Sequence, residues 1–313
     1  DSYIKKYGAD VLRLWVCSED FRRDIPLSDE ILGQVVRSYR TLRNTLKFQL
    51  GTLHDFDPNN HLIPVEDLDL IDRWALFKTA QLVEDVSTAF ESYEIHKSVQ
   101  LINRFCSGVL SSTYHDVIKD RLYTLHPDDP KRRSSQSAIY LVFDSLVRLL
   151  GPLTPFTADE AWSFLHSGES FTTDSLLLQS WPQSQPSWLD DEKVADAEII
   201  LSLKESHINE SLENLRAAKK IGQSLDAEVE IRFPANESIA EVLRRHALDL
   251  AEFFIVSSVV LVADDTQSKI TVSAKHASGV RCPRSWRWVP ELVSVEPWGE
   301  VSPRCADVLS RNS

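Results

Sequence analysis

The segment between Ser28 and Leu50 carries apolar residues at the spacing of one helical face. An α-helix has about 3.6 residues per turn, so positions three and four apart share a side. The apolar positions with this spacing are Ile31, Leu32, Val35, Val36, Tyr39, Leu42, Leu46 and Leu50. Ser28 has the chemistry of an N-cap, and Gly51 stands where glycine often ends a helix. The pattern predicts one long amphipathic helix.

The same period recurs through the first two-thirds of the chain. The segments that carry it are 68–93, 94–123, 134–150 and 157–165. Loops rich in proline and aspartate or glycine, at 126–130 and 151–155, separate the later ones. Helices joined by short connections predict a mainly α fold, an antiparallel helical bundle.

The pattern changes near residue 185, after a stretch rich in proline and polar residues at 181–186. Segment 190–220 reads as one long charged helix. Strands are predicted at 227–233, 259–263 and 269–273, with helices between 238 and 254 to cover them. We therefore predict three domains: a helical domain at 1–185, a small α+β module at 186–275 and a short tail at 276–313 that is similar to a zinc knuckle.

The tail places Cys282, Ser285, Ser302 and Cys305 with two, sixteen and two intervening residues. Four cysteines at this spacing are a strong zinc signal. Here two positions are serine, whose neutral hydroxyl is a poor substitute for a thiolate. The nearest imidazole in the sequence is His276. Zinc bound by Cys282 and Cys305 stays a possibility on a degenerate frame, and we expect a tail that is metal-free and loosely ordered, or held by packing on the α+β module.

Charge is distributed unevenly over the 313 residues, whose net charge is -13. Residues 36–48 carry four basic side chains and no acid, and residues 269–313 carry seven basic against four acidic ones. An acidic chain with basic ends can still bind a polyanion at particular faces. The four cysteines are too few for a secreted disulfide framework, and no apolar run approaches the roughly 20 residues of a membrane span. We expect a cytoplasmic protein with no membrane and no DNA partner.

Two groups of residues have the chemistry of RNA binding, which needs cations for phosphates and amides or rings for bases. Arg40, Arg43, Asn44 and Lys47 share the polar face of the helix at 28–50, where the alternative is a solvated surface. Basic residues and indoles alternate in the tail at Arg281, Arg284, Trp286, Arg287, Trp288 and Arg304. Such rings stack on unpaired bases, whereas a buried tryptophan would stabilise the tail instead.

A third group, Lys119, Asp120, Arg121 and Tyr123, lies at a predicted helix end. It is either a salt-linked structural corner or a further RNA contact. Arg13 is expected to pack between domains. The isolated His96, His115 and His207 show no pattern of a metal or catalytic site.

Several segments together resemble a known family. Residues 6–15, Lys-Tyr-Gly-Ala-Asp-Val-Leu-Arg-Leu-Trp, resemble class I aminoacyl-tRNA synthetases for isoleucine, valine, leucine and methionine. Segments 43–58, 110–123 and 155–162 look like the isoleucine branch. Segment 217–227 is similar to bacterial-type isoleucyl-tRNA synthetases, which end in a four-cysteine zinc module with a tryptophan directly after the second cysteine; Trp286 occupies that place.

The resemblance implies that the bundle is an anticodon-binding domain and that the chain is the C-terminal part of such an enzyme. Its implied partners are tRNA(Ile) and the upstream catalytic and editing domains of the same protein. Neither a His-x-Gly-His-like nor a Lys-x-Ser-Lys-Ser-like signature is present, so ATP would bind only in that upstream domain and this chain should be non-catalytic. The alternatives are the equivalent region of a valyl-tRNA synthetase, which predicts a coiled-coil tail, and a stand-alone RNA-binding or regulatory protein derived from a synthetase.

Overall fold

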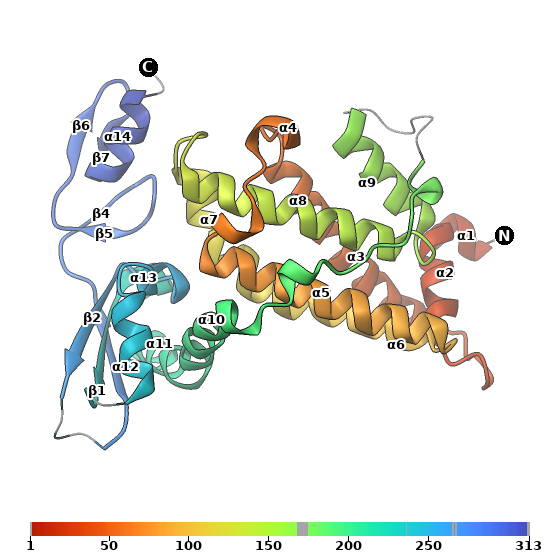
Figure 1. Ribbon diagram of the computed structural model, residues 1–313, viewed down its shortest axis with the longest axis horizontal. Helices are drawn as coiled ribbons and strands as arrows, with labels where there is room; N and C mark the ends of the chain where they lie inside the picture. The colour runs from red at the N-terminus through yellow and green to blue at the C-terminus, as the bar shows by residue number, and fades with distance from the viewer. Residues whose placement is uncertain (1, 168–174, 236, 265, 267, 312–313) are drawn as a thin grey trace. The chain divides into compact units, whose positions relative to one another are not determined.

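A computed structural model describes residues 2–167, 175–235, 237–264, 266 and 268–311. The chain divides into two compact units, the first formed by residues 1–115 and 133–191 and the second by residues 116–132 and 192–313. Helices form most of the first unit, and the three small sheets belong to the second (Figure 1). The predicted mainly helical domain with a small α+β module is confirmed. The predicted boundaries at 185 and 275 stay a prediction.

The first unit is built almost entirely from helices. Its α-helices are α1 (Ser2–Tyr7), α2 (Ala9–Ser18), α3 (Asp29–Thr52), α4 (Pro58–His61), α5 (Leu70–Glu91), α6 (Ile95–Arg104) and α9 (Pro155–Ser167), together with α8 (Pro130–Leu150) from residue 133 onward; residues 130–132 belong to the second unit. It also contains three short 3-10 helices, η1 (Val65–Asp67), η3 (Leu176–Leu178) and η4 (Pro186–Trp188), and one π-helix, η2 (Phe105–Tyr114). α2, α9 and η2 pack against α3, and α6 packs against α5.

Helix α3 confirms the amphipathic pattern. The Ser28 hydroxyl accepts a hydrogen bond from the Ile31 amide at 3.2 Å, as an N-cap does. The expected end at Gly51 is wrong, because the helix continues to Thr52. Gly51 has no atom within 4 Å of where a Cβ would lie, and the Thr52 hydroxyl donates to the Gln49 carbonyl at 2.9 Å. The C-cap is Leu53, whose amide donates to the Gln49 carbonyl at 3.1 Å.

The predicted single helix at 94–123 is wrong in detail. Between α6 and α7 (His115–Thr124) lies η2, a π-helix. The hydroxyls of Ser111, Ser112 and Thr113 donate to carbonyls five residues earlier, at 2.7, 2.7 and 3.1 Å, and so support the wider turn. Segment 190–220 is likewise α10 (Asp191–Leu203), the π-helix η5 (Lys204–Ile208) and α11 (Asn209–Ala217).

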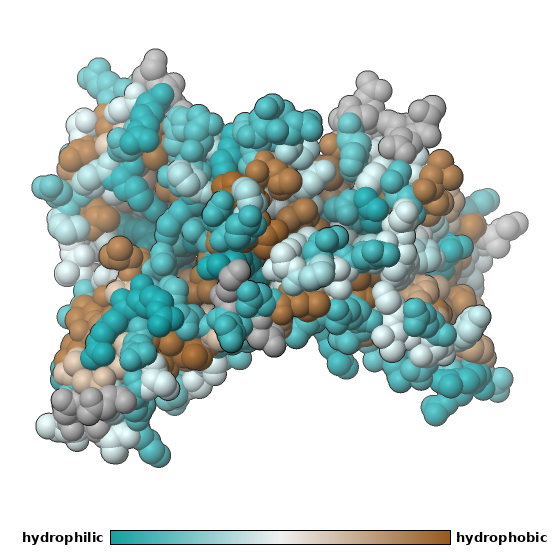
Figure 2. Space-filling view, in the orientation of Figure 1, coloured by the Kyte–Doolittle hydropathy of each residue, from teal (hydrophilic) through white to brown (hydrophobic). Residues whose placement is uncertain are grey.

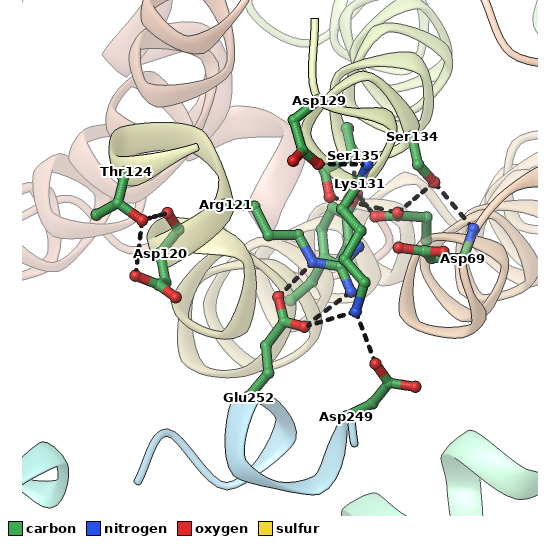
Figure 3. Close-up of polar contacts among 12 residues, drawn as sticks. Asp69, Asp120, Arg121, Thr124, Asp129, Lys131, Ser134, Ser135, Asp249 and Glu252 are labelled. Carbon is green, nitrogen blue, oxygen red and sulfur yellow. Dashed lines mark hydrogen bonds and ion pairs between the residues drawn. The ribbon is translucent and has the colours of Figure 1, made fainter. Parts of the chain in front are cut away.

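A buried carboxylate joins three elements of the first unit. Asp72 of α5 is fully buried and accepts hydrogen bonds from the Tyr114 hydroxyl of η2 at 2.7 Å and from the Ser134 hydroxyl of α8 at 2.6 Å. The Ser134 hydroxyl also accepts from the Asp69 amide at 2.9 Å (Figure 3). A buried charge needs such donors to offset its desolvation, so these contacts fix the register of the bundle.

The second unit contains a three-stranded sheet in the order β2-β1-β3. β1 (Ala227–Phe233) pairs in parallel with β2 (Ser258–Ala263) and antiparallel with β3 (Thr271–His276). The turn η6 (Ser224–Asp226) precedes β1, and α12 (Ser238–Arg245) and α13 (Leu250–Phe253) form the crossover from β1 to β2 that parallel pairing requires. The strand expected at 269–273 lies two to three residues later, in the register that pairs Val272 with Ile231.

The tail forms two small hairpin ladders and a helix. β4 (Val280–Arg281) pairs with β5 (Trp288–Val289), β6 (Val293–Val295) pairs with β7 (Gly299–Val301), and α14 (Pro303–Arg311) follows. Cys282, Val301, Cys305 and Leu309 form its buried core. α14 is absent from the sequence prediction, although Cys305, Val308 and Leu309 have helical spacing and Pro303 suits a first helical position.

Within the described ranges, no helix is both long enough and apolar enough to cross a membrane. On the face shown in Figure 2, hydrophobic side chains lie in small groups among polar ones.

Candidate nucleic-acid interface

Helix α3 presents a row of exposed side chains, four basic and one amide, which we call the α3 stripe. Its members are Arg37, Arg40, Arg43, Asn44 and Lys47, all exposed, while Leu42 and Leu46 on the other side are buried. Among the described residues, none of the four cations forms an ion pair with a carboxylate. Arg43 and Lys47 also line a shallow pocket of about 440 Å³ with Phe164 of α9. The predicted shared polar face is confirmed, and its charges are available for an external anion.

The second candidate surface centres on Trp286. The Trp286 amide donates to the Cys282 carbonyl at 2.9 Å, and the Cys282 amide donates to the Arg287 carbonyl at 2.9 Å. This tight turn holds Trp286 at a φ of 62°, a left-handed conformation that is unusual for a bulky residue. Trp286 is 54% exposed, and the Arg281 guanidinium lies 5.6 Å from the centroid of its indole ring. The turn therefore directs a large ring, with a cation beside it, toward solvent.

A pocket of about 490 Å³ lies beside this indole; we call it the Trp286 pocket. Lys119 and the exposed Tyr123 come from α7, and Leu225 and Ile255 add apolar surface. Flat aromatic ligands bind in pockets that combine such rings with nearby cations. Sequence reasoning missed Leu225 and Ile255, and likewise Phe164 of the α3 pocket, because no local pattern signals residues brought together by tertiary packing.

Three arginines of the tail are engaged by the second unit itself. Arg304 contacts the Asp120 carboxylate at 2.7 and 2.8 Å, and Arg287 lies 3.3 Å from the same carboxylate. Arg284 donates to the Thr124 carbonyl. Burial raises the pKa of Asp120, but the hydrogen bond from Arg304 and the charges of Arg287 and Arg304 outweigh it and leave the pKa below its ordinary value. The structure thus places these arginines at α7.

The group at 119–123 is largely salt-linked. Arg121 pairs with Glu252 of α13, and Lys131 lies 2.7 Å from Asp249 at the start of the same helix (Figure 3). Lys119 pairs with Asp116 at 2.8 Å across one helical turn. The Arg121–Glu252 pair joins α7 to α13 of the α+β module, and Lys119 and Tyr123 are the exposed members of the group.

The cysteine and serine frame of the tail converges as its spacing predicts. The Cys282 and Cys305 sulfurs are 3.9 Å apart, close to the edge of about 3.8 Å in a tetrahedron with Zn–S bonds of about 2.3 Å. The Ser302 amide donates to the Cys282 sulfur at 3.3 Å. Burial raises the pKa of Cys282, but hydrogen bonds from Ser285 and Ser302 outweigh it and lower the pKa to about 6.

The donors gathered at this frame do not match what structural zinc takes, which is four thiolates or imidazoles. Two vertices are serine hydroxyls. The His276 Nδ1 lies 2.7 Å from the Ala277 carbonyl, and the edge of its ring packs against Trp288. Within the part of the chain that the structure describes, no three residues among His, Cys, Asp and Glu are grouped to hold a metal ion.

The remaining predicted residues have structural contacts. Arg13 donates to the Pro152 carbonyl at 3.0 Å inside the first unit. Trp288 donates from its indole nitrogen to Asp226 at 3.0 Å and is only partly exposed, so it is the tryptophan that stabilises the tail.

Comparison with known proteins identifies the family to which the chain belongs. The family described as "Anticodon-binding domain of tRNA ligase" matches residues 72–231, just over half of the chain. The chain is 37% identical over 322 residues to an isoleucine–tRNA ligase of Thermoanaerobacter sp. (strain X514), covering 99% of this chain and 34% of that protein. It is 38% identical to the isoleucine–tRNA ligase of Thermotoga maritima, covering 98% and 33%. The chain therefore spans about a third of the length of these relatives.

One solved structure, a ternary complex of Agrobacterium radiobacter K84 agnB2 LeuRS with tRNA and LeuAMS, has a TM-score of 0.43 and 14% identity, covering 80% of this chain and 27% of that one. A likeness this weak carries no weight in the assignment. The assignment depends on the family match and on the similarity to isoleucine–tRNA ligases, which extends over nearly the whole chain. The chain belongs to the anticodon-binding domain family of tRNA ligases.

Proposed function

We propose that this chain recognises tRNA(Ile) as the tRNA-binding portion of an isoleucine–tRNA ligase. The names of its relatives support isoleucine rather than valine. The observation that carries the proposal is the exposed Trp286 indole, which the turn after Cys282 presents beside the Trp286 pocket and Arg281.

Each unit would supply one kind of contact. The α3 stripe would bind phosphates, because its cations are exposed and unneutralised, and each phosphate contact releases condensed counterions. Trp286 and Tyr123 would stack on unpaired bases, a contribution of about 1 to 3 kcal/mol per base in comparable proteins. Arg284, Arg287 and Arg304 would act less directly, by holding the turn that presents Trp286.

The chemistry of aminoacylation would belong to other domains of a cytoplasmic parent protein. The class I activation signatures are missing from these 313 residues, so ATP has no expected site here. We expect the purified chain to show no isoleucine-dependent pyrophosphate exchange. Measurable exchange would contradict this assignment of roles.

The test of the proposal compares two exposed indoles of the tail. Trp286→Ala should weaken binding of a tRNA(Ile) transcript by about tenfold, since one stacking contact of about 1.4 kcal/mol is lost. Trp298→Ala is the matched control, because Trp298 is 60% exposed but is flanked by Glu296 and Glu300. Filter binding measures both variants beside the unaltered chain.

Equal affinity of the two variants would contradict the role of Trp286. Binding of unrelated RNAs as tightly as tRNA(Ile) would favour the alternative of a general synthetase-derived RNA-binding protein. A second series between about 50 and about 200 mM salt should lower affinity steeply, as phosphate contacts require.

A further inference from the structure

We infer that the knuckle module, residues 276–311, folds without a bound metal ion, held instead by hydrogen bonds at Ser302 and by three arginine contacts to the rest of its unit. The inference does not depend on tRNA binding. It concerns what stabilises the module that presents Trp286.

The geometry of a tetrahedral site is kept while its chemistry is not. Cys282, Ser285, Ser302 and Cys305 are all buried, and the two sulfurs keep the spacing of a tetrahedral edge. Two thiolates and two neutral hydroxyls bind zinc far more weakly than four thiolates, because the ligands must be deprotonated to bind. A frame that keeps its shape with a poor donor set needs another source of stability.

Ser302 supplies part of that stability from inside the frame. Its amide donates to the Cys282 sulfur at 3.3 Å, and its hydroxyl accepts from the Cys305 amide at 3.4 Å, as an N-cap of α14 would. These contacts link the turn at Cys282 to the start of α14, the two segments that a metal ion would otherwise join. Val301 and Leu309 pack around the sulfurs and add apolar burial.

The arginines anchor the module from outside. Arg284 reaches the Thr124 carbonyl at the end of α7 and lies 3.6 Å from the Cys305 sulfur. Arg287 donates to the Val256 carbonyl at 3.0 Å and pairs with Asp120 at 3.3 Å, while Arg304 pairs with Asp120. Each arginine follows a frame residue by no more than two positions, so each contact restrains the frame directly.

The first experiment measures metal content and melting of the full chain, purified in a phosphine reductant. Plasma emission spectrometry should find less than about a tenth of an equivalent of zinc or of any other transition metal, and a strong chelator should leave every melting transition unchanged. A full equivalent that resists dialysis, or a transition lowered by the chelator, would overturn the inference.

Two variants test the inference in ways that do not depend on the metal content of one preparation of the unaltered chain. Ser285→Cys with Ser302→Cys should retain about one zinc per chain and melt at a chelator-sensitive temperature, because the frame then has four thiolates. If this double variant holds no zinc, the four positions do not form a tetrahedral frame and the argument fails.

Ser302→Ala should lower the melting temperature of the second unit by about 2 to 4 °C, whether or not chelator is present. The control is Ser310→Ala, whose exposed hydroxyl bonds only to the Ala306 carbonyl of its own helix. Equal melting of the two variants would show that the Ser302 hydroxyl does not stabilise the module and would overturn that part of the inference.

Discussion

The Arg304 guanidinium pairs with the Asp120 carboxylate through two contacts, at 2.7 and 2.8 Å. Arg287 approaches the same carboxylate at 3.3 Å, so one acid of α7 receives two cations from the tail. The Asp120 side chain is 19% exposed, which limits screening by solvent. This carboxylate joins the part of the unit that carries Tyr123 to the part that carries Trp286.

Replacing Asp120 should destabilise the second unit. Asp120→Asn removes the charge that two arginines share, and we expect a loss of about 1 to 2 kcal/mol in the free energy of unfolding. Asp116→Asn is the control, since Asp116 is 42% exposed and pairs across one turn with Lys119, a kind of contact that contributes about 0.5 kcal/mol or less. Urea unfolding measures both. Equal destabilisation by the two changes would refute the role of Asp120.

The same carboxylate should give the unit acid sensitivity. Its pKa is lowered in the folded state, so its stabilising effect is present above the unfolded pKa of about 3.9 and is lost as pH falls through the lower folded pKa. The difference in unfolding free energy between the unaltered chain and Asp120→Asn should therefore be full near about pH 7 and shrink below about pH 4. A difference that stays constant down to about pH 2 would mean that the ion pairs are not its source.

Charge reversal should identify the α3 stripe as a phosphate-binding surface. The triple variant Arg40→Glu, Arg43→Glu, Lys47→Glu should bind tRNA(Ile) about a hundredfold more weakly, or worse, at low salt. The slope of log affinity against log salt concentration should fall by the amount that about three phosphate contacts contribute. The helix should persist, because the three side chains are exposed and make no ion pair with the described residues. Circular dichroism checks the fold.

The control for the stripe makes the same change of charge elsewhere in the first unit. Lys5, Arg23 and Arg104 are exposed bases outside α3, and changing all three to Glu should lower affinity much less. If both triple variants lose affinity equally, net charge alone governs binding, and the stripe is an ordinary solvated face.

Local patterns predicted some features of this protein well. The apolar spacing of α3 places Leu42 and Leu46 in the core, and the Ser28 cap follows from its side-chain chemistry. The spacing of the frame brings Cys282 and Cys305 together. Each of these depends on residues close in sequence or on a fixed spacing, which is why the sequence reveals them.

Other features depend on contacts that no local pattern encodes. The buried residues of the π-helix η2 recur four or five positions apart, at Phe105 or Cys106, Leu110 and Tyr114, and over ten residues this spacing is too close to the three and four of an α-helix to reveal the wider turns. Asp120 and Arg304 are 184 residues apart, and the sequence alone favours reading Arg304 as a free cation. The Trp286 pocket combines residues from α7, the turn before β1 and the tail, which only the folded chain brings together.

The most direct test of the account compares two RNAs on the full chain: a tRNA(Ile) transcript, and the same transcript with its anticodon loop replaced by that of a tRNA for another amino acid. An anticodon-binding function predicts that the replacement weakens binding by about tenfold or more, and that Trp286→Ala removes most of this discrimination. Equal affinity for the two transcripts would contradict the account, because binding would then depend on the RNA backbone and not on the anticodon.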